Sequence, residues 1–150
     1  MDTELMKRMM DACYLAKRAR ELLPPLPKGV TSSYIQYMDV IQKLEEKGMR
    51  AKVSDISSAL NLPRPGVTRT VKDMETKGYL VKETSAEDGR VTYLSLSGKG
   101  RELSAKYDRD YFGRLSPYMD AISREDAECT IRTIEKFYQV MSERRIYFEK

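Results

Sequence analysis

The chain has 150 residues, 41% of them hydrophobic and 33% charged, with a formal net charge of +4. A chain of this length can bury a core without disulfides or a structural metal, and its composition is that of a helix-rich globular protein rather than a disordered tail. It contains no histidine, and its two cysteines, Cys13 and Cys129, are far apart, which excludes the usual Cys/His zinc sites, so we expect no metal and no cofactor.

The first predicted helix covers Thr3–Leu23. Its apolar residues recur at helical spacing, and the PPLPKG sequence that follows cannot continue a helix. Charges throughout this segment exclude the apolar core of a signal peptide, and no run of about 18 apolar residues occurs in the chain. We therefore expect a cytoplasmic protein with no membrane span.

Two further helices are predicted before the middle of the chain. One begins with Thr31 or Ser32 as its N-cap and ends at Gly48. The next, about two turns long, takes Ser54 as its N-cap. Its expected buried stripe is Ile56, Ala59 and Leu60.

The stretch from Asn61 to Gly78 begins with two prolines and a glycine and continues as a helix. Proline suits the first turn, where the backbone N–H has no partner within the helix. Val67, Val71 and Met74 form one core-facing side. The opposite side carries residue types that contact phosphates and base edges, namely Arg64, Pro65, Thr68, Arg69, Lys72 and Thr76. Two short helices joined by a tight turn predict a helix-turn-helix, and an ordinary helical hairpin is the alternative.

The net charge is concentrated in this middle part. Between Arg50 and Arg101 there are ten lysines and arginines against six acidic residues, and the remaining 98 residues sum to zero. A basic middle between neutral flanks is typical of a nucleic-acid-binding module, although a plain solvated surface explains it equally well.

A β-hairpin is predicted next, because two alternating segments flank Asp88-Gly89 in YLVKETSAEDGRVTYLSLS. A hairpin directly after a helix-turn-helix is a wing. Arg90 at its tip can enter a narrow minor groove, and Asp88 would orient it through a charge-assisted hydrogen bond.

Two long helices are predicted after the hairpin. The first has Ser97 as its N-cap and runs to about Pro117, and the second begins at a capping box formed by Ser123 and Asp126. The first and last helices of the chain are amphipathic, so each has an apolar side to bury. A second copy of the chain is the expected partner, and packing on the monomer's own core is the alternative.

Several motifs together resemble the MarR family of winged helix-turn-helix transcriptional regulators. They are Val67-Thr68-Arg69, Met74-Glu75-x-Lys77-Gly78-Tyr79-Leu80, Asp88-x-Arg90 and Leu96-Ser97-x-x-Gly100. The resemblance covers essentially the whole chain. It implies a single domain over 1–150, mainly α with a small β-hairpin wing. The winged helix-turn-helix would cover 31–101 with its tip near 85–91, and 1–30 and 102–150 would be dimerisation helices.

The resemblance also implies a homodimeric repressor, not an enzyme, that binds a palindromic operator in double-stranded DNA. The positions matching DNA-contacting ones are Arg64, Pro65, Gly66, Thr68, Arg69 and Lys72 on the helix and Asp88 and Arg90 on the wing. The chain departs from the family pattern where Pro63 replaces a Ser or Asp N-cap and where Pro65-Gly66 replaces small hydroxyl residues.

Two kinds of signal are open for such a regulator. By resemblance, a small aromatic ligand would bind between the dimerisation helices and the winged helix, with Tyr14, Tyr34 and Tyr37 as candidate pocket residues, although tyrosines on amphipathic helices also serve as packing residues. The alternative is redox sensing through Cys13, which lies about where peroxide-sensing members carry a reactive cysteine.

Two other classes of function fit less well. An enzyme would need a nucleophile beside a base or a phosphate-binding glycine loop, and neither occurs here. A winged helix that binds protein would need an apolar or acidic outer face, whereas Arg64, Arg69 and Lys72 make this face cationic.

Overall fold

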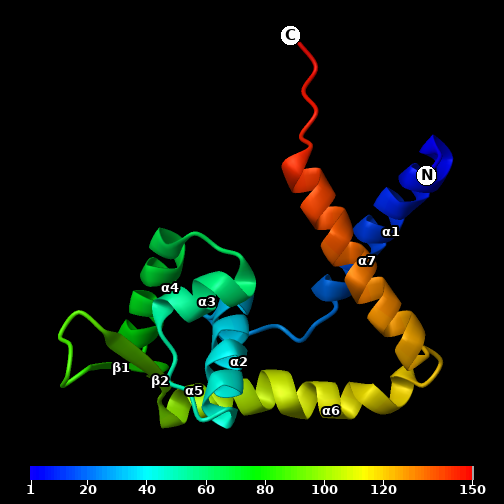
Figure 1. The fold of residues 1–150 in the computed structure, drawn as a ribbon. Coiled ribbons are helices and arrows are strands. Elements are labelled where there is room, and N and C mark those ends of the chain that lie inside the picture. The colour runs from blue at the N-terminus through cyan, green and yellow to red at the C-terminus, as the bar shows by residue number, and fades with distance from the viewer. Residues whose placement is uncertain (150) are drawn as a thin grey trace. The chain divides into compact units, whose positions relative to one another are not determined.

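Helices and a β-hairpin form the described part of the chain, as the sequence predicts (Figure 1). The computed structural model describes residues 1–149, which divide into one unit, Met1–Asp110, and a second that begins at Tyr111. The elements of the first unit are α1 (Thr3–Glu21), α2 (Ser32–Glu46), α3 (Val53–Leu60), α4 (Arg64–Thr76), β1 (Leu80–Thr84), β2 (Thr92–Leu96), α5 (Gly98–Ser104) and a π-helical turn (Ala105–Asp110). The second unit contains α6 (Tyr111–Leu115), a 3₁₀ turn (Ser116–Met119) and α7 (Arg124–Glu143).

Most helix starts follow the predicted capping residues. Thr31 is the N-cap of α2, Pro63 is that of α4, and Ser97 caps α5 by accepting the N–H of Gly100 at 3.1 Å. The Ser123 hydroxyl accepts the N–H of Asp126 at 3.0 Å, so Ser123 is the N-cap of α7 as predicted. The Asp126 carboxylate accepts the hydroxyl of Ser123 at 2.7 Å, rather than its backbone N–H as in a complete capping box.

The predicted start of α3 is wrong. Its N-cap is Lys52 rather than Ser54, because the carboxylate of Asp55 accepts the backbone N–H of Lys52 at 2.8 Å and starts the helix earlier. Ile56 is fully buried as expected, but Ala59 is exposed. The helix ends at Asn61, whose left-handed φ of 51° leads into the turn before α4.

The wing is a two-stranded antiparallel hairpin in which Leu80 faces Leu96 and Thr84 faces Thr92. The N–H of Leu94 donates to the carbonyl of Ala51 at 2.8 Å, which attaches the α2–α3 connection to the hairpin. This extra pairing fixes the base of the wing on the helical part of the unit.

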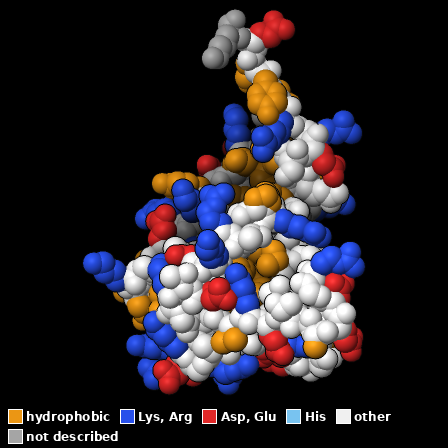
Figure 2. Space-filling model, turned by 90° about the vertical axis from the view of Figure 1, so that its left-hand side faces the viewer, with side chains coloured by type: hydrophobic (Ala, Val, Ile, Leu, Met, Phe, Trp, Pro, Cys, Tyr) orange, Lys and Arg blue, Asp and Glu red, His pale blue; other side chains and the backbone are white. Residues whose placement is uncertain are grey.

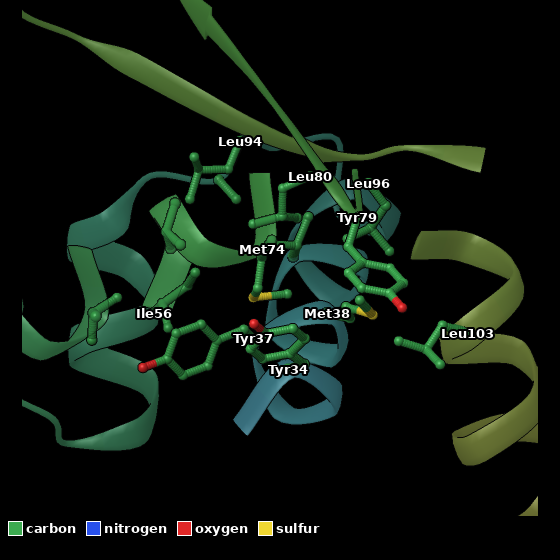
Figure 3. Close-up of a cluster of buried hydrophobic side chains, with 14 residues drawn as sticks. Tyr34, Tyr37, Met38, Ile56, Met74, Tyr79, Leu80, Leu94, Leu96 and Leu103 are labelled. Carbon is green, nitrogen blue, oxygen red and sulfur yellow. The ribbon is translucent and has the colours of Figure 1, made fainter. Parts of the chain in front are cut away.

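The core of the first unit lies between α2, α3, α4 and the hairpin (Figure 3). Its buried residues include Tyr34, Tyr37, Met38, Ile41, Ile56, Val67, Val71, Met74, Tyr79, Leu80, Leu94, Leu96 and Leu103. Gly100 is required here, because a Cβ at this position would lie 2.2 Å from the carbonyl oxygen of Tyr79. The glycine of the Leu96-Ser97-x-x-Gly100 motif therefore allows α5 to pack directly on the strand start.

The helix after Ser97 is less regular than predicted. It ends close to the expected Pro117, but it passes through the π-helical turn Ala105–Asp110 and finishes as the 3₁₀ turn. Just before the π-helical turn, the buried hydroxyl of Ser104 donates to the side-chain oxygen of Gln42 at 2.7 Å. No motif in the sequence signals this change of helical geometry.

The two terminal helices bury little. None of the described residues of α1 or of α7 is buried, although both helices carry several large apolar side chains. Among residues 1–149, no helix combines the length and apolarity that crossing a membrane would need.

Candidate nucleic-acid interface

The outer face of α4 carries the helix residues that the sequence analysis predicts to contact DNA. Arg64, Pro65, Gly66, Thr68, Arg69 and Lys72 are all exposed. Val67, Val71 and Met74 on the other side of the helix are fully buried. Packing of this apolar side therefore orients the whole helix and leaves its cationic side free for a partner.

Ion pairs neutralise the acidic residues of this helix. The two acidic residues of α4 are both paired, Asp73 with Lys77 at 3.0 Å and Glu75 with Lys82 at 3.5 Å. Within the described part of the chain, Arg64, Arg69 and Lys72 form no ion pair. Lysines beyond the end of the helix, Lys77 and Lys82, thus neutralise the acids of α4, while the cations of the helix itself remain available.

A groove of about 450 Å³ runs beside this face, between the start of α2 and α4. Its lining residues are Thr31, Tyr34, Arg69, Thr70, Lys72, Asp73 and Thr76. Thr31 is the N-cap of α2 and makes no side-chain capping bond, so this helix end presents backbone donors and the positive end of its dipole. Together with Arg69 and Lys72, it makes the groove favourable for an anion. Sequence analysis predicted Thr31 only as the N-cap of this helix and named neither Thr31 nor Thr70 as a site residue, although a threonine at a helix start is a usable signal.

The wing tip positions its arginine through the neighbouring aspartate. The loop spans the residues between Thr84 and Thr92, longer than a two-residue turn at Asp88-Gly89. Asp88 accepts the backbone N–H of Arg90 at 3.0 Å, its Nε at 3.2 Å and a terminal guanidinium nitrogen at 3.3 Å. Hydrogen bonds from the Arg90 side chain, and then from its backbone, lower the pKa of Asp88 below its ordinary value. The predicted Asp88–Arg90 contact is present, and the arginine side chain remains 91% exposed.

Other cations of the basic middle are used within the unit. Arg50 lies over the ring of Tyr93, 4.0 Å from its centroid, and pairs with Glu83 at 2.7 Å. Arg101 pairs with Glu45 at 3.2 Å. These contacts hold the wing and α5 against α2. In contrast to these two arginines, Arg64, Arg69 and Lys72 of α4 form no ion pair in the described part of the chain, and Arg90 at the wing tip pairs only with the neighbouring Asp88. Figure 2 shows lysine and arginine side chains interspersed with acidic ones on the face that it views.

The structure distributes the predicted pocket and redox residues over different environments. Tyr34 and Tyr37 lie in the core, 1% and 3% exposed (Figure 3). Tyr14 is on α1 and 65% exposed, and Cys13 beside it is partly buried. The groove beside α4 is lined by Tyr34 but by neither Tyr14 nor Tyr37.

Comparison with known proteins gives a consistent assignment. Residues 28–91 match the sequence model of the MarR family. An uncharacterised HTH-type transcriptional regulator of Bacillus subtilis, YdgJ, is 28% identical over 110 residues, which cover 72% of this chain and 63% of the relative. The transcriptional regulator AdcR of Streptococcus pyogenes is 23% identical over 90 residues, 60% of each chain. The matched segments thus span about three fifths of these curated relatives.

Solved structures show the same fold. The crystal structure of AdcR from Streptococcus pyogenes superposes with a TM-score of 0.68 at 17% identity, covering 91% of this chain and 97% of that one. FabT of Streptococcus pneumoniae, solved in complex with DNA, superposes with a TM-score of 0.67 at 22% identity, covering 95% and 99%. These likenesses confirm the predicted winged-helix fold class.

Proposed function

We propose that this chain, whose residues 28–91 belong to the MarR family, is a DNA-binding transcriptional regulator that acts as a homodimer on a palindromic operator. The observation that carries the proposal is the outer face of α4, where three unpaired cations stand beside exposed threonine, proline and glycine while both acids of the helix are neutralised.

In this proposal α4 enters the DNA major groove. Arg64, Thr68 and Arg69 reach base edges, and Arg69 and Lys72 border the groove at the α2 N-terminus, where a backbone phosphate is bound. Gly66 has open space around its α-carbon, so the DNA backbone can approach the start of the helix closely. Sequence selection and phosphate binding thus come from adjacent parts of one surface.

The wing supplies a second contact. Arg90 is almost fully exposed and held by Asp88, so its guanidinium is oriented before binding and loses less freedom when it enters the minor groove. The wing arginine therefore reads the DNA that flanks the major-groove site.

Dimerisation is supported by the exposed apolar residues of the terminal helices. On α1 these are Leu5, Met6, Met10 and Leu15, and on α7 they are Ile131, Ile134, Tyr138 and Met141. Several exposed apolar side chains along one helix are more than the single scattered ones of an ordinary surface, which supports a partner for each helix. A symmetric second copy is the economical one, and two α4 helices about 34 Å apart would then contact successive major grooves.

Regulation by an effector completes the proposal. We expect repression that a small aromatic ligand relieves, with Tyr14, Tyr34 and Tyr37 as candidate pocket residues. Since Tyr34 and Tyr37 are packed in the core, a ligand would reach them only after local rearrangement. Redox sensing through Cys13 is the alternative: peroxide would then lower DNA affinity in the parent but not in Cys13→Ser.

The function is tested by fluorescence anisotropy on the DNA upstream of the protein's own gene, across a salt series and with unrelated DNA as competitor. We expect tight, competitor-resistant binding with a steep salt dependence. Arg69→Ala and Lys72→Ala should weaken it, whereas Lys47→Ala, which removes an exposed cation at the other end of α2, should not.

Binding no tighter than to competitor DNA, also with a pool of random sequences, would contradict the proposal. It would favour a winged helix that contacts another protein.

A further inference from the structure

Lys77 joins the end of α4 to the region of Gly29 and Tyr34, more than 40 positions earlier in the sequence. This residue follows α4, and its ammonium donates to the carbonyl of Gly29 at 2.7 Å, to the Tyr34 hydroxyl at 3.0 Å and to the Asp73 carboxylate at 3.0 Å. A lysine ammonium has three donors, and all three are used here. The contacts connect the turn before α2, α2 itself and the last turns of α4.

The Tyr34 hydroxyl makes this connection specific. The side chain is 1% exposed, and its hydroxyl donates to Asp73 while it accepts from Lys77. A hydroxyl on a nearly buried side chain pays a desolvation cost when it loses its partners. Tyr34 therefore holds α4 to α2 at one defined position.

The Gly29 carbonyl belongs to a tight turn at the end of the connection from α1. Gly29 has a φ of +80°, and the N–H of Val30 donates to the carbonyl of Pro27 at 3.0 Å. A side chain at Gly29 would be strained, and its Cβ would lie 3.4 Å from the Lys77 ammonium. The turn thus offers Lys77 a rigid acceptor rather than a mobile loop.

The same end of α4 is held from its other side by α5. The Lys99 ammonium donates to the carbonyl of Lys77 at 2.9 Å, and the Ser97 hydroxyl donates to the carbonyl of Gly78. The C-terminal end of α4 therefore lies between two anchors, of which only the Lys77 anchor leads back to the α1–α2 connection.

We propose that Lys77 is a positioning residue that transmits the position of the turn Pro27–Val30 to α4. A displacement of the connection from α1 moves or breaks the Gly29–Lys77 bond, and the Tyr34–Asp73–Lys77 contacts carry that change into the DNA-contacting helix. The consequence for DNA rests on the function proposed above, whereas the coupling of the two segments does not.

Hydrogen exchange on the full-length protein tests the coupling without DNA. Lys77→Met keeps the side-chain stem and removes the donors. We expect the amides of Val30 and of Lys77 and Tyr79, all hydrogen-bonded in the structure, to exchange about tenfold faster together, the effect of losing one charge-assisted bond. Lys82→Met, which removes the other ion pair of α4, is the matched control and should leave Val30 unchanged.

Tyr34→Phe is the second variant, in case Lys77→Met fails to fold. It removes the hydroxyl but keeps the buried ring and the Lys77–Gly29 bond. We expect a smaller acceleration at the same amides. Acceleration at the end of α4 with Val30 unchanged in both variants would overturn the proposal, as would exchange equal to the parent's throughout.

A DNA measurement separates positioning from general stability. An operator is first selected from random DNA, and a second site is made in which its half-sites lie one base pair further apart. The ratio of the affinity for the selected site to that for the altered site should fall about tenfold in Lys77→Met. The same ratio should stay constant in Lys82→Met. An unchanged ratio in a protein that binds DNA selectively would overturn the proposal. If the parent does not bind selectively, the proposed function fails and the exchange measurement alone decides the coupling.

Discussion

Asp88 holds Arg90 by two routes, through the arginine's backbone N–H and through its guanidinium, while Arg90 itself extends into solvent. The aspartate at this cationic wing tip therefore organises the tip rather than repelling a nucleic acid. The two residues therefore have different roles: Arg90 would contact DNA, and Asp88 orients the Arg90 side chain.

Removing the wing arginine should weaken DNA binding broadly. Arg90→Ala is expected to lower affinity for all sequences and to reduce the log–log salt slope by about one unit for each phosphate that a subunit no longer neutralises. Asp88→Asn should lower affinity less, because the arginine remains but is no longer held. Anisotropy titrations at several salt concentrations measure both effects, and an unchanged slope in Arg90→Ala would show that this arginine does not contact phosphates or the minor groove.

The Asp88–Arg90 contact should be insensitive to pH near neutrality. The pKa of Asp88 is lowered in the folded protein, so its contribution is complete above the ordinary carboxyl pKa and is lost only as the pH falls through the lowered value. NMR of the Arg90 Nε resonance from pH 8 downward checks this sign. Separation of the two side chains near neutral pH would be inconsistent with it.

Residues on the outer face of α4 should change sequence preference. Replacing Thr68 or Arg69 with alanine is expected to alter the preferred base pairs by about 1 to 3 kcal/mol per pair where the contact is bidentate or well packed. Lys72→Ala should instead weaken all sequences alike, as a phosphate contact does. Selection of binding sites from random DNA with each variant measures its preferred sequence. Uniform losses in every variant would rule out base recognition by this helix.

A methyl group at Gly100 should destabilise the first unit. Its Cβ would lie 2.2 Å from the Tyr79 carbonyl, so Gly100→Ala forces α5 away from the strand start, at a cost of about 1 to 3 kcal/mol. Gly98→Ala is the control, since nothing lies within 4 Å of a Cβ there. Urea unfolding measures the difference. Equal stability of the two variants would mean that α5 can shift freely.

Protonation of Asp108 at low pH should remove a cost to the stability of the folded protein. Burial first, and then the negative charge of Asp39, raise the pKa of Asp108, while Lys43 and Arg109 oppose the shift. Because the folded protein binds this proton more tightly, the charged form at neutral pH costs stability, and the cost disappears as the pH falls below the ordinary carboxyl pKa.

The variant Asp108→Asn isolates this effect. It should therefore raise the melting temperature at pH 7 and lose that advantage at low pH. Asp110→Asn, at an exposed neighbouring position, should do neither. A lower melting temperature in Asp108→Asn at pH 7 would show that the carboxylate instead makes a stabilising contact.

A charge on the apolar side of α7 should prevent dimerisation. Ile134 is 46% exposed in the single chain, so Ile134→Asp should fold but sediment as a monomer and lose operator affinity. Arg132→Glu, on the opposite side of the helix, should stay dimeric. A dimeric Ile134→Asp protein would place the interface elsewhere.

The order of the elements and the outer face of α4 could be predicted from the sequence alone. Apolar spacing in Val67, Val71 and Met74 determines which side of that helix is buried. Pro63 at its N-cap and Pro65 in its first turn indicate where it starts. Both signals are local, because they depend on helical periodicity and on backbone N–H groups within one turn. The hairpin and its Asp88–Arg90 contact could be predicted for the same reason, because they depend on residues close in sequence.

Only the tertiary structure decided which charges remain available and how α4 is anchored. Tyr34 looks like an ordinary core residue in the sequence, yet its hydroxyl meets Asp73 and Lys77, about 40 positions further on. The pairing of Glu75 with Lys82, the groove at Thr31 and the π-helical turn after Ser104 likewise depend on neighbours or geometry that no motif records. Such contacts arise because packing of the apolar sides brings polar groups together, and burial then requires that each finds a partner.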